Sequence, residues 1–468
     1  MRQMKKLTNF IRVNAGKQSI PKFYLKHLSE KRRTLENIYK VSQLDFDIPN
    51  KKGNNKSLRY VVYADAEELL DKILEERSEN NNVLVKVMAD GGQGFFKISF
   101  TVIPECYIDE LNESHGDYLK QERITYKDGG SLSNLSKLTG VNKLIMICCV
   151  PDVKETYENI KILFDITQLN NIPFKFVSDF KLILTVNGKQ TATSMYPSPY
   201  CFITLNELRE ISDDAPKCYD KEERCFKLLT YGDLKENYNK FKQYGHNKKY
   251  AMDCHSCVNP PLFEEDDNVF VIEKCIPPEL HMLQGFVNHL FWDGIVPLLG
   301  KEKALLWPKT LKLVAKNYQG DIFEGNACRK LIMMADKLLD PEILGDIREF
   351  EIMPFISTFK ASNEIVVNAF SNYKPSADLE KDIMHLRNCF RATRVSETLK
   401  IHVVLYHIDD ALPFLNNSGL GLWSEQVGES IHREFIKYWN KYRINLIEDA
   451  NYGTRLKRTV VEFSSSHM

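Results

Sequence analysis

The sequence has no apolar run long enough to cross a membrane. Its longest strongly apolar run, residues 144–150 (LIMICCV), is short, whereas a membrane-spanning helix needs about 20 residues. The first residues, MRQMKKLTNFIRV, are basic and contain no continuous apolar core with a small-residue cleavage site, so no secretory leader is expected. The sequence therefore predicts a protein without a membrane partner.

A disulfide framework and a P-loop are also missing. The 11 cysteines are odd in number and spread along the chain, which favours free thiols or metal ligands in a reducing compartment. The glycine turn at residues 91–94 lies between two predicted strands and lacks the Gly-Lys-Ser/Thr ending of a P-loop. A strand–Asp-Gly-Gly–strand hairpin also occurs in actin-like and sugar-kinase ATPases, so ATP binding stays open as an alternative.

The composition is that of a globular protein with an uneven charge distribution. The chain has 468 residues, 43% of them hydrophobic, and its 63 basic and 63 acidic side chains cancel. Residues 1–60 contain 15 Lys/Arg and four acids, so this end carries +11 and the remainder −11. The basic end is interpreted either as an arm that binds a polyanion or as a solvated tail.

Hydrophobic periodicity divides the chain into a mixed core and a helical block. A linker at 50–56 precedes a helix at 64–77, and a hairpin then pairs residues 83–89 with 95–103, its first strand ending at Asp90. Further elements are predicted as strand 143–150, helix 152–167, strand 174–177 ending at Asp179, helical stretches over 205–397, a β-rich or mixed stretch at 398–407, and helix 423–442. The pattern predicts an α/β core that is interrupted by a helical insertion.

Two groups of residues have the composition of metal sites. Asp90 and Asp179 each follow an apolar strand, and Glu425 and Glu429 share one face of the last predicted helix; either glutamate could complete a carboxylate cluster for Mg²⁺ or Mn²⁺. Strand-end aspartates also start turns, and a glutamate face is often solvated.

The second group has the spacing of zinc ligands. Cys254 and Cys257 form a C-x₂-C pair, and His402 and His407 form an H-x₄-H pair. Either pair alone is equally compatible with buried core residues.

The motifs, taken in order, resemble those of the Transib-type DDE transposases and the catalytic core of the V(D)J recombinase. The matching segments are 89–94 (ADGGQG), 177–182 (VSDFKL), 196–201 (YPSPYC), 325–331 (GNACRKL), the pair His402/His407 and 424–430 (SEQVGES). The resemblance spans about residues 83–440. It implies an RNase H-like mixed-sheet core interrupted by a large, zinc-containing helical insertion.

The resemblance also implies an activity and a division of the chain. Metal-dependent DNA cleavage and strand transfer would use two Mg²⁺ or Mn²⁺ ions held by Asp90, Asp179 and Glu429, the last preferred because the Glu-Ser pair matches the motif's end. Double-stranded DNA, a homodimer on DNA and a nuclear location are expected. The units would be a basic arm and linker (1–60), the first part of the core (61–204), the insertion (205–397) and the return to the core (398–468).

One position departs from the family pattern. Ser198 stands where the first zinc cysteine is expected, so a zinc site would use Cys201, His402 and His407 with Ser198 nearby, or recruit Cys254 or Cys257. The departure favours a second hypothesis, a catalytically inactive transposon relic or host-retained protein that binds DNA or protein. Deletion of residues 1–50 is predicted to weaken duplex DNA binding, to lower its salt dependence and to leave the core folded; unchanged binding would favour the relic.

Overall fold

A computed structural model describes residues 22–49, 56–77, 82–106, 108–109, 112, 143–211, 219–220, 225–316 and 321–468. Strands in this part of the chain form one mixed sheet and a separate two-stranded ribbon, β7 (Tyr219–Asp220) with β8 (Cys225–Phe226). The strands of the main sheet are β1 (Lys40–Asp47), β2 (Lys56–Tyr63), β3 (Val83–Gly92), β4 (Phe95–Pro104), β5 (Ile145–Pro151), β6 (Lys175–Val177) and β9 (Cys275–Ile276).

The order of strands in the main sheet is β1-β2-β5-β4-β3-β6-β9. Pairing is antiparallel from β1 as far as β3, whereas β6 runs parallel to β3 and β9 runs parallel to β6. The hairpin predicted for β3 and β4 is confirmed, and its turn places Gln93 and Gly94 at φ 53° and 78°, a backbone region that suits glycine. The carboxyl ends of β3 and β6 therefore lie side by side at one edge of the sheet.

The centre of the sheet is covered on both faces. Every residue of β4 and β5 is buried, which explains why these strands are continuously apolar and not alternating. Helix α6 (Tyr157–Thr167) contacts β5, α20 (Gln426–Tyr442) contacts β3, and α21 (Tyr452–His467) contacts β2 and β5. The helix predicted over 423–442 is confirmed as α20, and its apolar stripe of Ile431, Phe435 and Trp439, spaced four residues apart, is buried.

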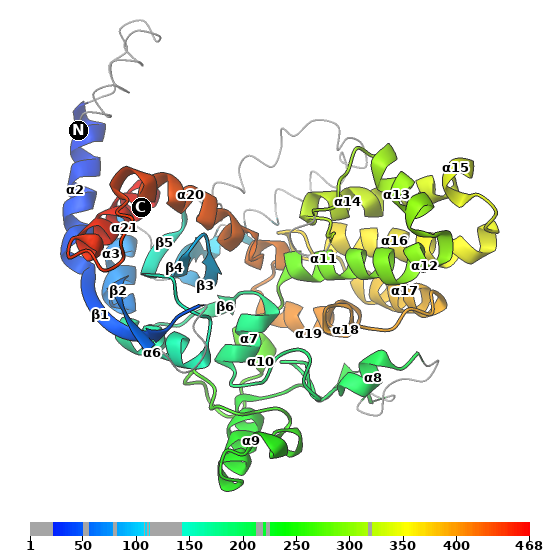
Figure 1. Cartoon of the computed structure of the whole chain (residues 1–468), viewed down its shortest axis with the longest axis horizontal. Coiled ribbons are helices and arrows are strands. Elements are labelled where there is room, and N and C mark those ends of the chain that lie inside the picture. Colours follow the sequence, from blue (N-terminus) through cyan, green and yellow to red (C-terminus); the bar gives the residue numbers. More distant parts are fainter. Residues whose placement is uncertain are drawn as a thin grey trace, which may run out of the picture.

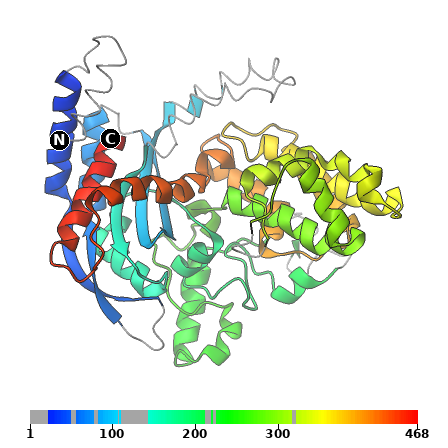
Figure 2. The same cartoon turned by 45° about the horizontal axis from the view of Figure 1, so that its top comes forward.

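A block of helices stands beside the sheet, and α20 extends from the block back across the sheet (Figures 1 and 2). Helix α9 projects away from both (Figure 1). The remaining helices are α2 (Lys22–Ile38), α3 (Ala66–Arg77), α7 (Phe180–Val186), α8 (Leu205–Arg209), α9 (Tyr231–Gln243), α10 (Val271–Lys274), α11 (Glu279–His289), α12 (Val296–Leu299), α13 (Lys301–Thr310), α14 (Gly325–Met333), α15 (Pro341–Leu344), α16 (Glu349–Asn368), α17 (Leu379–Ala392), α18 (Leu399–Tyr406) and α19 (Ile408–Ala411).

Two predictions about the second half of the chain need correction. The block expected to be helical over 205–397 contains β9, which belongs to the main sheet. The stretch 398–407, expected to be β-rich or mixed, is helix α18, which the Thr398 hydroxyl caps by accepting a hydrogen bond from the Ile401 amide. Its β-branched residues favour strands, but packing against α11 and α17 determines the conformation.

The basic end of the chain is also more than an arm and linker. The boundary expected at residue 60 falls inside β2, and β1 and β2 extend the main sheet. Leu35, Tyr39 and Phe46 are buried in the main core. The physical reason is that β1 and β2 pair with each other along their whole length. The pair buries the apolar side chains of Phe46, Val61 and Val62 in the core.

No helix in the described ranges is long and apolar enough to cross a membrane.

Candidate functional site

Asp90 and Asp179 line one cavity at the carboxyl ends of β3 and β6. Asp179 caps α7, since its Oδ1 accepts a hydrogen bond from the Leu182 amide at 2.7 Å. The hydroxyl of Ser178 donates to the Ala89 carbonyl at 2.6 Å and so ties the two strand ends together. The structure therefore brings together the two aspartates that the sequence singled out.

A glutamate at the start of α20 lines the same cavity. The Glu425 side chain is 5% exposed, and its Oε1 accepts hydrogen bonds from the backbone amide and the Nδ1 of His281, each at 2.8 Å. Its Oε2 is buried and has no hydrogen-bond partner among the described residues. Glu429, which the motif favours, lies in α20, but its side chain is outside the part that the structure describes.

Two lysines interact with these carboxylates, Lys86, which is buried, and Lys400, which is half-buried. Lys86 of β3 donates through Nζ to the carbonyls of Leu422 and Ser424 at 3.1 and 2.6 Å, just before α20 begins. Burial lowers the pKa of Lys86 to about 7, although the charge of Glu425 opposes this shift. Burial also lowers the pKa of Lys400, and here Asp179 and Glu425 oppose it. In its protonated form each lysine attracts the nearby acids, and burial disfavours that form.

Asp90 is held by a chain of two further side chains. His432 of α20 places Nε2 at 2.7 Å from the Asp90 carboxylate, and Lys97 Nζ lies 2.6 Å from Nδ1 of the same ring. Lys97 also donates to the carbonyls of Gly92 and Phe95, each at 3.2 Å. Because an ammonium group has three protons and no acceptor, Nδ1 must accept and Nε2–H must donate to Asp90.

Both glycines of the Asp-Gly-Gly motif make room for residues beside Asp90. A Cβ on Gly92 would lie 2.5 Å from the His432 ring, and a Cβ on Gly91 would lie 2.2 Å from Glu155. Glu155 in turn forms an ion pair with Lys181 at 2.5 Å. Neighbouring side chains therefore favour glycine at positions 91 and 92, in addition to the turn that the motif forms.

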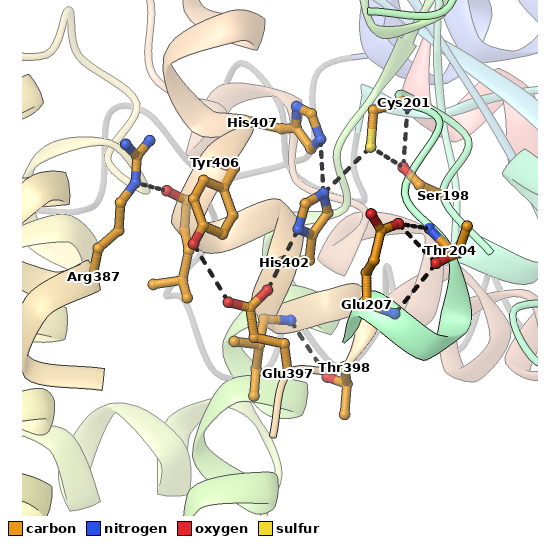
Figure 3. A network of polar contacts seen from close by, with 12 residues as sticks. Ser198, Cys201, Thr204, Glu207, Arg387, Glu397, Thr398, His402, Tyr406 and His407 are labelled. Carbon is orange, nitrogen blue, oxygen red and sulfur yellow. Dashed lines mark hydrogen bonds and ion pairs between the residues drawn. The ribbon is translucent and has the colours of Figure 1, made fainter. Parts of the chain in front are cut away.

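A second group, Cys201, His402 and His407, has its three ligand atoms within 4.8 Å of one another and is fully buried. Cys201 Sγ lies 3.3 Å from His402 Nε2, which lies 3.1 Å from His407 Nε2. Figure 3 shows the two rings and the thiol pointing toward one another. These separations are close to the edges of about 3.3–3.7 Å expected for nitrogen and sulfur ligands around one tetrahedral ion. The group could hold a metal ion such as zinc.

The two histidines have the outer contacts that metal-ligating histidines usually have. Nδ1 of His407 lies 2.7 Å from Asp410. Nδ1 of His402 points toward Glu397 (Figure 3), at the longer ion-pair distance of 3.5 Å. Carboxylates at Nδ1 direct the Nε2 atoms toward the ion. Burial opposes ionisation of Cys201, but the two histidines lower the pKa of its thiol well below the usual range. A thiolate is the form that binds metal.

Ser198 lies at the edge of this group. Its hydroxyl oxygen is 3.3 Å from Cys201 Sγ and accepts hydrogen bonds from the amides of Tyr200 and Cys201 at 3.1 and 3.2 Å. Ser198 thus lies beside the cysteine of the group, and its place at a fourth corner stays a prediction. Cys254 and Cys257, the alternative ligands, are buried elsewhere and do not belong to the group found among the described residues.

Sequence reasoning missed His281, His432 and the lysines of the site. His432 follows Glu425 by seven residues, or about two helical turns, so the two side chains share a face of the last helix. This spacing could have identified His432 from the sequence as a neighbour of the site. His281 comes from α11, distant in sequence, and only the fold brings it to Glu425.

No family model matches the chain, and no curated protein matches it.

Proposed function

We propose that the protein is a metal-dependent DNA-cleaving and strand-transferring enzyme, similar to Transib-type transposases. The observation on which this rests is the convergence of Asp90, Asp179 and a glutamate from the start of α20 on one cavity. Three carboxylates from two adjacent strand ends and a returning helix are a suitable set of ligands for Mg²⁺ or Mn²⁺.

The strand order supports an RNase H-like core. Strands β5, β4 and β3 form an antiparallel meander, and β6 and β9 follow in parallel on the side of β3. The helical block between β9 and α20 corresponds to the large insertion. This arrangement makes the first and second aspartates neighbours although they are far apart in sequence.

The residues present fit divalent ions. Glu425 Oε2 is buried without a partner, and a buried carboxylate oxygen normally has one. Two bound ions would supply an activated water or hydroxyl and stabilise the leaving oxygen of a phosphodiester. The chain's own residues would orient the ligands: His432 holds one oxygen of Asp90, and His281 holds one oxygen of Glu425.

We also propose that Cys201, His402 and His407 bind zinc in a structural role. Thiolate and imidazole ligands with carboxylates behind them suit zinc better than Mg²⁺. The cysteine comes from the segment after α7 and the histidines from the end of the helical block. Zinc at this position would fasten the block to the core.

A nicking assay on supercoiled plasmid with Mg²⁺ or Mn²⁺ tests the proposal. We expect metal-dependent nicking that is lost in Asp90→Asn and Asp179→Asn and retained in Asp165→Asn, a control on the exposed surface of α6. Glu425→Gln and Glu429→Gln, compared side by side, identify the third acid. Nicking that persists in both aspartate variants would contradict the proposal.

The substitution at Ser198 favours a second function, DNA binding without cleavage by a relic of the same fold. Its first zinc ligand would have been lost while the three acids were retained. This alternative would be supported if zinc-loaded protein bound duplex DNA but did not nick it in the presence of Mg²⁺ or Mn²⁺. The homodimer and the nuclear location stay predictions.

A further inference from the structure

We propose that the basic tip of α9, defined as residues 240–252, binds the phosphate backbone of duplex DNA. DNA as the partner rests on the proposed function. Helix α9 projects from the rest of the molecule (Figure 1), and the sequence of the tip is rich in lysine and tyrosine.

The charge of the tip contrasts with that of the chain around it. Residues 237–252 contain four lysines and no acid, although residues 61–468 together carry a net charge of −11. Lys240 donates to the Asp253 carbonyl at 2.7 Å. Lys242, Lys248 and Lys249 are exposed and form no ion pair with any described residue. Three ammonium groups therefore face solvent together.

Two tyrosines stand among these lysines. The rings of Tyr244 and Tyr250 stack at 4.8 Å with 25° between their planes, and the residues are 41% and 37% exposed. Large aromatic rings are usually mostly buried in a folded protein, so an exposed stacked pair is available to a partner. Tyrosine hydroxyls and lysines are both usual contacts to phosphate oxygens, so the exposed pair fits the same partner.

The tip is rigidly supported. It has a small core of its own, formed by Phe241, Ala251 and Cys254. Gly245 at φ 66° and His246 at φ 56° reverse the chain after α9, and the Asn247 side chain accepts from the Lys249 amide at 3.0 Å. The lysines are therefore presented on an ordered turn.

The base of this projection is fixed to the segment that bears Asp179. The amides of Val258 and Asn259 donate to the Gly188 carbonyl at 2.8 and 3.0 Å, directly after α7, and Asp179 caps the other end of α7. Helix α9 has 13 residues, so it is about 20 Å long at a rise of 1.5 Å per residue. That length corresponds to about six base pairs at 3.4 Å each. We therefore expect the tip to contact the flank of a duplex whose cut site lies in the cavity, and not the cut site itself.

The test measures binding of a fluorescently labelled duplex to the full-length protein over a range of salt concentrations without divalent metal. The triple variant Lys242→Gln/Lys248→Gln/Lys249→Gln is compared with Lys309→Gln/Lys312→Gln/Lys337→Gln, which removes three exposed lysines from the helical block. Each lost phosphate contact lowers the slope of log affinity against log salt by about 0.9. We expect a reduction of up to about 2.7 in the tip variant and little change in the control.

A tip variant whose affinity and salt slope equal those of the control overturns the inference. The double variant Tyr244→Ala/Tyr250→Ala should weaken binding and leave the salt slope nearly unchanged. Thermal unfolding of each variant verifies the fold. The nicking assay tests a separate claim. Weaker DNA binding by the tip variant supports the inference even if the wild-type protein does not cut DNA. If the tip variant binds and nicks DNA as well as the wild type, only the proposed function is supported.

Discussion

Asp90 depends on side chains that lie outside its own motif. The second glycine after it leaves space for the ring of His432, and Lys97 fixes which nitrogen of that ring bears the proton. The Nε2–H of His432 holds one carboxylate oxygen of Asp90, a residue that lines the cavity. His432 is thus a positioning residue for a proposed metal ligand, and its role differs from that of the ligand itself.

Replacement of His432 by alanine should weaken binding of Mn²⁺ by the full-length protein. Loss of an outer-shell partner of a ligand typically costs about 10–100-fold in metal affinity. His432→Gln should recover much of this loss, because its side-chain amide can donate to Asp90. Calorimetric titration with Mn²⁺ measures the change.

Asp90→Asn is the reference for this experiment, and it should abolish the same binding. If alanine and glutamine at position 432 weaken Mn²⁺ binding equally, the hydrogen bond to Asp90 has no positioning role. If Asp90→Asn itself has no effect, the carboxylate site is wrong and the role of His432 does not arise.

The group of Cys201, His402 and His407 has three metal-ligating side chains, and Ser198 stands where a fourth ligand is expected. The amides of Tyr200 and Cys201 already point at its oxygen, and they would donate equally to a thiolate. Ser198→Cys should therefore tighten zinc binding, on the order of tenfold or more, because thiolate is a much better zinc ligand than hydroxyl. Competition with a chromogenic chelator measures the affinity.

Ser362→Cys is a matched control, since Ser362 is a buried serine on α16. It should not change the zinc affinity. Equal zinc affinity for Ser198→Cys and the wild type would contradict a fourth corner at this position.

Element by element, the structure agrees with the sequence where periodicity was long and local. The hairpin of β3 and β4, the buried strand β5 and the stripe of α20 follow from patterns of at least seven residues. Strand β9 has two residues and no pattern of its own, because it exists only through pairing with β6. Helix α18 contains a β-branched pair, and tertiary packing overrides that preference.

The residues of the carboxylate site likewise divide into those that the sequence could predict and those that it could not. The two aspartates could be predicted because each ends a recognisable strand. The choice between Glu425 and Glu429 could not, since both lie on one helical face and their difference depends on how α20 begins. His281 could not be predicted either, because its contact joins α11 to the start of α20.

The proposed zinc group joins Cys201, in the segment after α7, to His402 and His407 at α18 of the helical block, so removal of metal should lower the stability of the protein. A ligand present at about 1,000 times its dissociation constant stabilises the folded state by about 4 kcal/mol. Thermal unfolding before and after treatment with a strong chelator should show a lower midpoint after treatment, with recovery on addition of zinc.

His407→Ala should have the same lowered thermal unfolding midpoint as the chelator-treated wild type, and the chelator should not lower the midpoint of this variant further. Lys381→Ala, an exposed change on α17, serves as the control. An unchanged midpoint after chelation, with metal analysis showing no zinc in the purified protein, would remove the proposed group.

At the scale of the whole molecule, the basic end is part of the fold. The Tyr39 hydroxyl donates to the Met146 carbonyl at 2.5 Å and lies 2.9 Å from Ser464 Oγ, so α2 and β1 are joined to β5 and α21. Arg32 forms an ion pair with Glu462 at 3.1 Å. Deletion of residues 1–50 therefore cannot test DNA binding alone, which corrects the expectation that the core would stay intact.

Two deletions separate charge from folding. Residues 1–21 contain five basic side chains and no acid, and every contact named above lies downstream of them. Their deletion should lower the salt slope of duplex binding by at most about 4.5, at 0.9 for each phosphate contact, with an unchanged unfolding midpoint. Deletion of residues 1–49 also removes Leu35, Ile38, Tyr39 and Phe46, which are all buried.

Burial of a large apolar side chain contributes roughly 1.5–3 kcal/mol, so the longer deletion removes about 6–12 kcal/mol. That loss is comparable with the total stability of about 5–15 kcal/mol expected of a folded protein, and β2 would become an uncovered edge. We expect the longer variant to unfold or aggregate. If it retains the wild-type midpoint, β1 is not an integral strand of the sheet; if the shorter deletion leaves both affinity and slope unchanged, residues 1–21 do not bind DNA.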